Sequence, residues 1–461
     1  MAKTQDLTKG SPMKLILGFG IPLLFGFLFQ QFYNIADTAI VGRFLGGDAL
    51  AAVGSTGSVN FLVIGFVMGI CNGFGIPISQ KFGAADYKQL RKYTAGSLWL
   101  CIIFSVVITA VTMIFCTDIL TITNTPADIF DRAYIYIFTI FCGISAYFLY
   151  NMSAAILRSL GDSKTPVVWL VISSVINIAL DVVFIFFFKM DVFGAALATV
   201  IAQFISGFGC LIKVCRGFEI LRMEKGDWIP SAKQTGILLA MGLPMGLQYS
   251  ITAIGSVMLQ TAVNQLGTMY VTAVTAASKL SMFVCCPFDA MGSTMATFAG
   301  QNVGAKQWDR LNRGLGACTI LGAVYSAASF VVLMFTGHLL AMIFLNEESM
   351  HLLPLVKQFL ITQAAFYFPL ALVNIVRFTI QGMGFSPTAT IAGVLEMIGR
   401  GLLAYLVGIY GFTAACFASP MAWILADAFL IPAYFVCRKR LLKKNGIEVS
   451  HKVRRARKVS A

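Results

Sequence analysis

Long apolar stretches separated by short polar breaks follow one another along most of the chain. Each stretch holds about 20 residues, which is enough for a helix to cross the roughly 30 Å hydrocarbon layer of a membrane. Such stretches recur from Leu15 to Val436, and we count about twelve of them. The pattern predicts an all-α polytopic membrane protein.

The overall composition agrees with this pattern. The chain has 461 residues, of which 58% are hydrophobic and 12% charged, and its mean hydropathy is +0.82. A water-soluble chain of this length is far less apolar. The segment 1–12 is polar, and the first apolar stretch continues past any plausible cleavage site, so we expect no cleavable signal peptide.

Lys and Arg gather in every second break. The basic segments are the N-terminal residues and the ranges 81–92, 158–164, 216–233, 306–313 and 438–458. Because cytoplasmic loops carry an excess of Lys and Arg, both termini are predicted to face the cytoplasm of a bacterial inner membrane. The net charge of +14 then reflects topology, and we expect contacts with anionic lipid headgroups but no nucleic-acid partner.

The two halves of the chain resemble each other at an offset of about 222 residues. Gly20-Ile-Pro22 matches Gly242-Leu-Pro244, and Ser79-Gln80 matches Gly300-Gln301. The repeat predicts two lobes of about six helices, related by a pseudo-two-fold axis near the membrane normal. We assign residues 1–215 to an N-terminal lobe, 216–233 to a cytoplasmic linker, 234–437 to a C-terminal lobe and 438–461 to a basic cytoplasmic tail.

Glycine and proline predict local features of the spans. Gly65, Gly69 and Gly73 recur every four residues, a spacing that lets helices approach closely. Pro22 lies inside the first span, where it removes a backbone hydrogen bond. The resulting kink is either a static bend or a hinge, and the sequence favours neither.

Several ionisable residues fall inside apolar stretches, where a charge costs at least about 2.5 kcal/mol on insertion scales. Asn177 and Asp181 are four residues apart and share a helix face, and Asn34 precedes Asp37 by three. Two carboxylates with neighbouring amide and hydroxyl oxygens could hold Na⁺ or share a proton. The alternative is that hydrogen-bonded acids only lock helices together, and spacing alone leaves both open.

The other intramembrane charges allow simpler interpretations. Glu396 and Arg400 are four residues apart, which predicts a structural ion pair within one helix. Arg377 and Asp427 are expected toward the cytoplasmic ends of their spans, where the arginine reaches water and the acid is solvated. Lys279 and Asp289, ten residues apart on one stretch, are expected to face a cavity between the lobes or a partner on another helix.

No enzyme motif is convincing. Gly161-Asp-Ser-Lys-Thr resembles a phosphate-binding loop but lacks the Gly-Lys-[Ser/Thr] ending and a preceding strand. The eleven cysteines lie mostly in apolar stretches without a CxxC pair, which is typical of small buried side chains. We expect no enzymatic activity, no cofactor and no metal other than a transported Na⁺.

Five stretches, in order, resemble the multidrug and toxic compound extrusion (MATE) family, and most closely its DinF-like branch. They are Ile35-Ala-Asp-Thr-Ala-Ile-Val-Gly-Arg43, Ala155-Ile-Leu-Arg-Ser-Leu-Gly-Asp162 with Pro166, Asn177-Ile-Ala-Leu-Asp181, Gly194-Ala-Ala-Leu-Ala-Thr199 and Gly300-Gln-Asn-Val-Gly-Ala305. The resemblance covers nearly the whole chain. It implies a monomeric secondary antiporter that exports amphipathic, cationic compounds by alternating access, in exchange for H⁺ or Na⁺.

The resemblance also implies where the coupling cation binds. In the DinF-like branch the site lies in the N-terminal lobe, which corresponds here to Asp37, Asn177, Asp181 and Thr199, with Asn151 nearby. Another branch places an acid on the seventh span, where this chain has Gln260. This departure favours coupling in the N-terminal lobe and leaves Asp289 as a possible counter-charge for cationic substrates.

Two other functions fit the sequence less well. A flippase for a lipid-linked precursor would line its cavity with several Arg or Lys, whereas the interior cations found in the sequence are Lys279 and Arg400. A receptor or scaffold has no need of the Asp37 and Asp181 pair. The residues that could line a permissive substrate cavity are Tyr33, Met68, Tyr147, Met258, Lys279, Met282 and Asp289. The substrate itself is not predicted.

Overall fold

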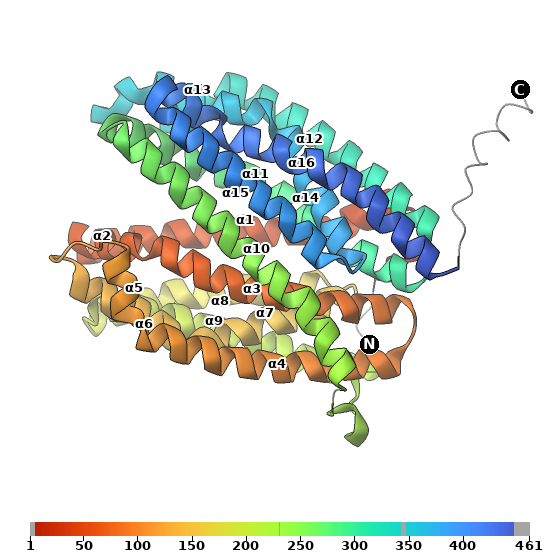
Figure 1. Ribbon diagram of the computed structural model, residues 1–461. Coiled ribbons are helices and arrows are strands. Elements are labelled where there is room, and N and C mark those ends of the chain that lie inside the picture. The colour runs from red at the N-terminus through yellow and green to blue at the C-terminus, as the bar shows by residue number, and fades with distance from the viewer. Residues whose placement is uncertain (1–4, 230, 343–346, 447–461) are drawn as a thin grey trace, which may run out of the picture.

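The structure is a computed structural model that describes residues 5–229, 231–342 and 347–446, and the regular elements in these ranges are all helices (Figure 1). In the first half they are α1 (Pro12–Leu45), α2 (Gly47–Ser55), α3 (Gly57–Gly83), α4 (Tyr87–Ile114), α5 (Cys116–Ile122), α6 (Phe130–Cys142), α7 (Ile144–Ser159), α8 (Lys164–Val182) and α9 (Asp191–Gly217). In the second half they are α10 (Ala232–Gln265), α11 (Thr268–Gly304), α12 (Trp308–Met342), α13 (Leu353–Ala365), α14 (Tyr367–Gly382), α15 (Ser386–Tyr410) and α16 (Phe412–Lys444). The last part of the predicted basic tail, residues 447–461, lies outside the described residues.

The number of membrane spans agrees with the sequence. Ten of the described helices are long and apolar enough to cross a membrane. Two further helix pairs, α6 with α7 and α13 with α14, are bent by 46° and 47° at a short break. If each bent pair is one span, the total is 12, and the bent pairs occupy equivalent places in the two halves. The predicted all-α polytopic fold with an internal repeat is confirmed.

Sequence signals set where several helices begin. Ser231 and Gln234 form a capping box at the start of α10, and the Asp86 carboxylate accepts a hydrogen bond from the Gln89 backbone at the start of α4. Proline occupies the first turn of α1, α13 and α15, where its missing N–H costs nothing. The chain between α9 and α10 holds only short 3₁₀ turns, and it coincides with most of the predicted linker.

The helices form two layers, with α2–α9 in one and α11–α16 in the other, while α1 and α10 run between them (Figure 1). The cores do not follow the chain strictly. Ile16, Phe19 and Leu23 from the beginning of α1 pack in the core of the second half. Leu238, near the beginning of α10, packs in the core of the first half. The exact lobe boundaries therefore stay a prediction.

Glycine permits the close approach of α3 and α10. A Cβ atom on Gly69 would lie 2.5 Å from the Met245 carbonyl oxygen, and one on Gly73 would lie 2.6 Å from the Gly242 Cα. Larger residues at these positions would push the helices apart. The recurrence of glycine every four residues thus marks a place where the two halves approach closely.

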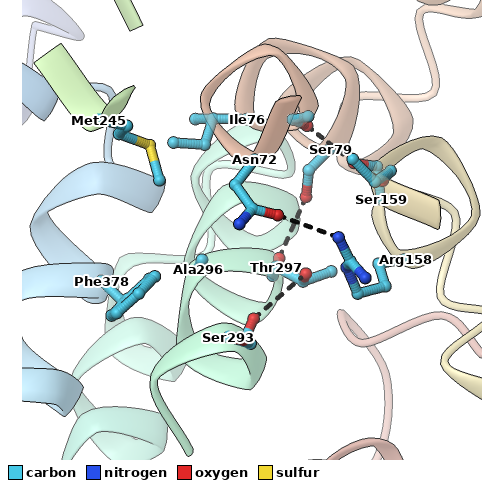
Figure 2. A pocket seen from close by; sticks show the side chains of 12 residues that line it. Asn72, Ile76, Ser79, Arg158, Ser159, Met245, Ser293, Ala296, Thr297 and Phe378 are labelled. Atoms are coloured by element: carbon cyan, nitrogen blue, oxygen red, sulfur yellow. Dashed lines mark hydrogen bonds between the residues drawn. The ribbon is translucent and has the colours of Figure 1, made fainter. Parts of the chain in front are cut away.

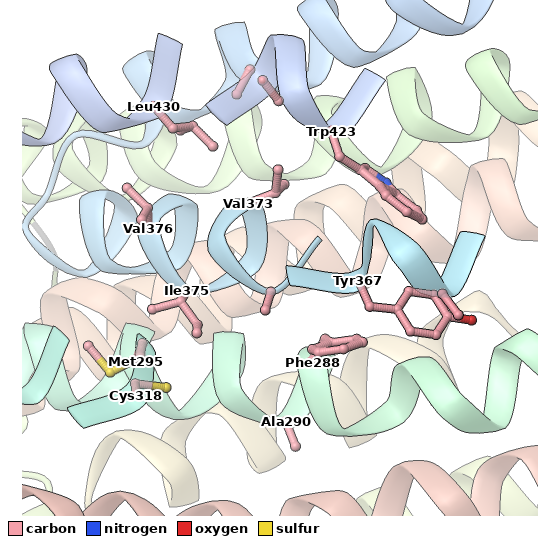
Figure 3. Close-up of a cluster of buried hydrophobic side chains, with 14 of the residues drawn as sticks. Phe288, Ala290, Met295, Cys318, Tyr367, Val373, Ile375, Val376, Trp423 and Leu430 are labelled. Carbon is pink, nitrogen blue, oxygen red and sulfur yellow. The ribbon is translucent and has the colours of Figure 1, made fainter. Parts of the chain in front are cut away.

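Aromatic rings fill the core of the second half. Tyr367 at the start of α14 lies between Phe288 of α11 and Trp423 of α16, with ring centroids 5.7 Å and 6.4 Å away (Figure 3). These distances are typical of favourable aromatic packing. Such packing holds the bent pair α13–α14 against its neighbours.

Candidate cation site and central cavity

Four predicted site residues meet inside the first half, on three helices. Asp37 comes from α1, Asn177 and Asp181 from α8, and Thr199 from α9. The Thr199 hydroxyl lies 3.4 Å from the Asn177 amide nitrogen and 3.2 Å from the hydroxyl of Tyr33, which is one turn before Asp37. A π-helical turn, Val183–Phe187, follows α8 directly after these residues. Such turns often occur at functional sites.

Several carboxyl and amide oxygens of this cluster have no hydrogen-bond donor among the described residues. Asn177 and Asp181 have no exposed surface, and the carboxyl groups of Asp37 and Asp181 lie close enough to interact directly. Within the described ranges, both carboxyl oxygens of Asp181, Oδ1 of Asp37 and Oδ1 of Asn177 have no hydrogen-bond partner. Buried acceptors are normally satisfied, so this cluster has the chemistry of a site for a proton or a small cation.

Asn151 takes a different position from the other four residues. Its amide nitrogen donates to the Tyr147 carbonyl of its own helix at 2.9 Å, and its side chain lines a cavity together with Tyr147 and Met68. Asn151 thus faces the cavity, and its part in the cation site stays a prediction. Gln203, one turn after Thr199 on α9, lines the same cavity, so the cavity and the cation cluster are adjacent.

The cavity lies between the two halves and has a volume of about 110 Å³. Its walls include Gln30 of α1, Asn72 of α3 and Tyr249 of α10. A second pocket of about 30 Å³ adjoins it, with Asn72, Arg158 and Ser293 in both walls. Figure 2 shows this pocket, where Arg158 of α7 points to Asn72.

The remaining predicted cavity residues lie elsewhere. Met258, Lys279 and Met282 are exposed and contribute to neither cavity wall, so their assignment stays a prediction. Asp289 lies one turn before Ser293 on α11 and interacts electrostatically with Tyr249. Asp289 is exposed and contributes to neither cavity wall, so its role toward cationic substrates stays a prediction. Pro22 lies within α1, which continues to Leu45, and its role as a hinge stays a prediction.

Arg158 is a cavity residue that the sequence analysis missed. The basic break 158–164 suggested a cytoplasmic loop, but α7 continues to Ser159, and this turn faces the other half of the molecule. A partial signal was available, because Arg158 lies within the stretch Ala155–Asp162, which resembles the MATE family. Charge counting could not reveal that the side chain turns inward.

The predicted ion pair of Glu396 with Arg400 is confirmed, with Oε2 and Nη2 3.4 Å apart. Glu396 also pairs with Arg377 of α14. Arg377 is only 5% exposed, so the prediction that it reaches water at a helix end is wrong, because a partner on α15 holds it inside. The prediction for Asp427 is also wrong: it is buried in the middle of α16 and interacts with Arg377.

Hydrogen bonds join the two halves at the end that carries the basic breaks. The Ser79 hydroxyl donates to the Thr297 carbonyl at 3.1 Å, and the Gln80 amide donates to the Gly382 carbonyl at 2.9 Å. From the other half, the Gln301 amide donates to the Ser159 carbonyl at 3.0 Å. Gln80 and Gln301 are equivalent in the internal repeat. The closure thus uses the same amide contact twice, once from each half.

Comparison with known sequences agrees with this architecture. The MatE family model matches residues 22–183 and 244–406, one block in each half. The probable multidrug resistance protein YpnP of Bacillus subtilis is 28% identical over 416 residues, covering 89% of this chain and 90% of that protein. The probable multidrug resistance protein YoeA of the same organism is 29% identical over 352 residues, covering 75% and 76%. An FAD transporter of Shewanella oneidensis is 23% identical over 374 residues, covering 78% and 80%.

Solved structures share the fold. A MATE protein in a bent conformation matches with a TM-score of 0.86 at 23% identity, covering 96% of this chain and 99% of that one. An outward-facing multidrug resistance MATE transporter matches with a TM-score of 0.87 at 23% identity, covering 96% and 100%. Together with the family match across both halves, these likenesses show that the chain belongs to the MATE family of membrane transporters and is not an enzyme.

Proposed function

We propose that this chain is a secondary active antiporter of a bacterial inner membrane, which exports amphipathic, cationic compounds in exchange for H⁺ or Na⁺. Relatives named as multidrug resistance and multidrug export proteins support drug efflux as the general function. The observation that carries the coupling part of the proposal is the donor-free group of acceptors around Asp37 and Asp181.

The unpaired acceptors of Asp181 favour binding of a proton or a cation. Asp181 is fully buried, and its two carboxyl oxygens have no donor among the described residues. An ionised carboxylate in such a place is costly unless a proton or a cation neutralises it. Binding of the coupling ion would therefore stabilise the arrangement seen here. The oxygen donors suit Na⁺, and the close acid pair suits H⁺, so the proposal includes both ions.

Ion binding can affect the substrate because the two sites share a wall. Gln30 and Gln203 line the cavity one turn from Tyr33 and Thr199, and the hydroxyls of Tyr33 and Thr199 join α1 to α9 at the cation cluster. A movement of α1 on ion binding would change the shape of the cavity. This linkage is the physical basis of exchange: the ion and the substrate favour different arrangements of the same helices.

The orientation follows from the charged loops. The hydrogen bonds that close the two halves lie at the basic end, which the positive-inside rule assigns to the cytoplasm. The structure would then be closed toward the cytoplasm, with both termini inside. A cysteine introduced near Lys225 should react with an impermeant thiol reagent only when the inner face is accessible. Labelling in intact cells would reverse the assigned topology.

The flippase alternative gains little support. Arg377 and Arg400 are interior cations, but both pair with Glu396. Arg158 is the cation that lines the described cavities, whereas a pyrophosphate group would need several.

The test is transport by the purified protein in liposomes. A cationic fluorescent dye is followed while a pH gradient or a Na⁺ gradient is imposed. We expect dye export to require at least one of the two gradients. Export that continues undiminished after both gradients are collapsed would exclude secondary antiport.

A further inference from the structure

We propose that Arg158 determines substrate specificity by binding an acidic group of the transported compound, so that amphipathic zwitterions are preferred over otherwise identical cations. The proposal rests on the proposed function, because it concerns the substrate of the same cavity. It adds a carboxylate-binding or phosphate-binding subsite to a transporter expected to take cations.

The bonding of Arg158 leaves most of its donors free. One guanidinium nitrogen, Nη2, donates to the Asn72 side-chain oxygen at 2.9 Å (Figure 2). Among the described residues, no acid forms an ion pair with Arg158, and its other nitrogens are not among the enclosed donors that lack a partner. Those N–H groups therefore face the cavities that the side chain lines.

The acid closest to Arg158 in the sequence is already occupied. Asp162 accepts hydrogen bonds from the backbone of Lys164 and Thr165 and from the Thr165 hydroxyl at 2.6 Å. These bonds hold Asp162 at the start of α8. Other interior arginines show the contrast, since Arg377 and Arg400 share Glu396. Arg158 is thus an interior cation that has a polar neighbour but no charge partner in the described chain, an arrangement suited to an incoming anion.

The size of the pocket favours a substituent over a whole ligand. Arg158 lines a space of about 30 Å³, which also includes Ser293 and Thr297. Cavities for drug-sized molecules hold about 300 Å³ or more. A carboxylate or phosphate group could enter this pocket beside the guanidinium, while the apolar body of the compound remains in the adjoining cavity of about 110 Å³ and the space beyond it.

An acid lies on the other side of the same region. Asp289 lies on α11 one turn before Ser293, which lines the same pocket as Arg158, so the two opposite charges are near this pocket. They are not paired with each other in this structure. An amphipathic compound with an amine and an acid could therefore satisfy Asp289 and Arg158 at the same time.

A matched dye pair tests the proposal. A rhodamine with a free carboxylate is zwitterionic, and its methyl ester is a cation of nearly the same shape. Binding of each dye to the detergent-purified full chain is measured by fluorescence anisotropy. We expect the wild type to bind the acid more tightly than the ester. Arg158→Gln should weaken acid binding about tenfold or more, as for a lost charge-assisted hydrogen bond, with little effect on the ester.

Two further variants control the result. Arg158→Lys keeps the charge and should retain part of the preference for the acid. Arg132→Gln removes an arginine that is paired with Asp191 and takes no part in the cavities, and it should leave the preference unchanged. If Arg158→Gln does not fold, the wild-type comparison alone decides, and equal or weaker binding of the acid overturns the proposal. An equal loss for both dyes in Arg158→Gln also overturns it.

The binding measurement is independent of coupling. If the ester is exported under a gradient but the acid is not preferred, this inference fails and the antiporter function stands. If neither dye is exported under any gradient, the antiporter function fails, while the binding ratio still reports on Arg158.

Discussion

Asp181 has no exposed surface, and both of its carboxyl oxygens lack a donor in the part of the chain that the structure describes. Proteins rarely leave such acceptors unsatisfied, because an unpaired buried polar group costs about 1–3 kcal/mol and a charge costs more. A purely structural role would be served better by an amide or by a paired acid. The second half shows this alternative, since Glu396 has an arginine on either side.

Ion binding at this site should therefore stabilise the fold. We expect saturating Na⁺, or acidification if the ion is H⁺, to raise the melting temperature of the wild type by a few degrees, since an ion at about 100 times its Kd adds about 2.7 kcal/mol. Asp181→Asn should lose this response while folding normally. Thermal unfolding measures this response, and the surface variant Asp191→Asn is the control. An unchanged ion response in Asp181→Asn would argue against the site.

Glu396 is predicted to act on stability more than on transport. Glu396→Gln leaves Arg377 and Arg400 without their shared carboxylate, and breaking a buried ion pair costs about 3–5 kcal/mol. We expect a marked fall in melting temperature, with transport per folded molecule largely retained. Asp191→Asn breaks a half-exposed pair with Arg132 and should cost at most about 1 kcal/mol. Normal stability with lost transport in Glu396→Gln would assign this cluster to the mechanism instead.

Sequence reasoning found the acids of the cation site and missed the orientation of two arginines. Asp37 and Asp181 were visible because a carboxylate in an apolar stretch has few structural explanations. Arg158 and Arg377 are near polar breaks, where a long side chain can reach water or turn inward. The partner that decides between these directions, Asn72 or Glu396, is on another helix. Only the folded chain reveals it.

Residues 5–11, which precede α1, form a strap across the end of the molecule where hydrogen bonds join the two halves. Leu7 is fully buried, and its backbone N–H donates to the Gln301 side chain at 2.9 Å. Its carbonyl accepts from Arg310 at 3.1 Å, and the Gly10 carbonyl accepts from the same guanidinium at 2.6 Å. Since Gln301 also reaches Ser159 of the first half, the strap reinforces a contact between the halves.

Removing this strap should favour opening at the basic end. We expect deletion of residues 5–10 to lengthen the distance between spin labels at Lys88 and Lys306, measured by pulsed electron resonance after the reactive native cysteines are replaced. Lys9→Gln changes an exposed side chain of the same segment and should have no effect. An unchanged distance distribution in the deletion variant would show that the strap does not hold the closure.

The ion pair between Arg91 of α4 and Asp227 of the linker predicts that stability depends on pH. Burial alone would raise the pKa of Asp227, but hydrogen bonds from Arg91 and the Glu224 backbone, and the charges of Arg91 and Lys92, hold it below its usual range. A lowered folded-state pKa adds stability that is present above the ordinary aspartate pKa of about 3.9 and is lost as pH falls through the folded value. Asp227→Asn should remove this contribution, which is at most about 1 kcal/mol. The free energy of unfolding, measured as the pH is lowered, should then fall less in the variant than in the wild type. If the stability of the variant falls with decreasing pH in the same way as that of the wild type, the Arg91–Asp227 pair does not stabilise the fold.

Most elements were predictable because hydrophobic length reports a membrane span directly. The bends at Gly143 and Phe366 were missed because each bent pair reads as one apolar stretch, although Gly143 itself and Pro369, in the first turn of α14, are signals for a break. The short helices α2 and α5 were also missed, because their lengths are well below a span. Packing against neighbouring helices decides where such short helices form, and the hydrophobic pattern does not record that packing.

At the scale of the whole molecule, the internal repeat predicted the two-layer architecture and the equivalence of Gln80 and Gln301. It could not predict that the beginnings of α1 and α10 pack in the core of the opposite half. This exchange depends on contacts between residues far apart in the chain. It also means that α1, which carries Asp37, packs against both halves.

The most direct test of the central claim is ion movement driven by substrate. In liposomes without an imposed ion gradient, a dye gradient across the wild-type protein should drive H⁺ or Na⁺ in the opposite direction, followed with ion-sensitive probes. Asp37→Asn and Asp181→Asn, inserted at matched density, should still bind dye but move no ion. Wild-type ion movement by both variants, or dye movement through the wild type without any ion movement, would contradict the account.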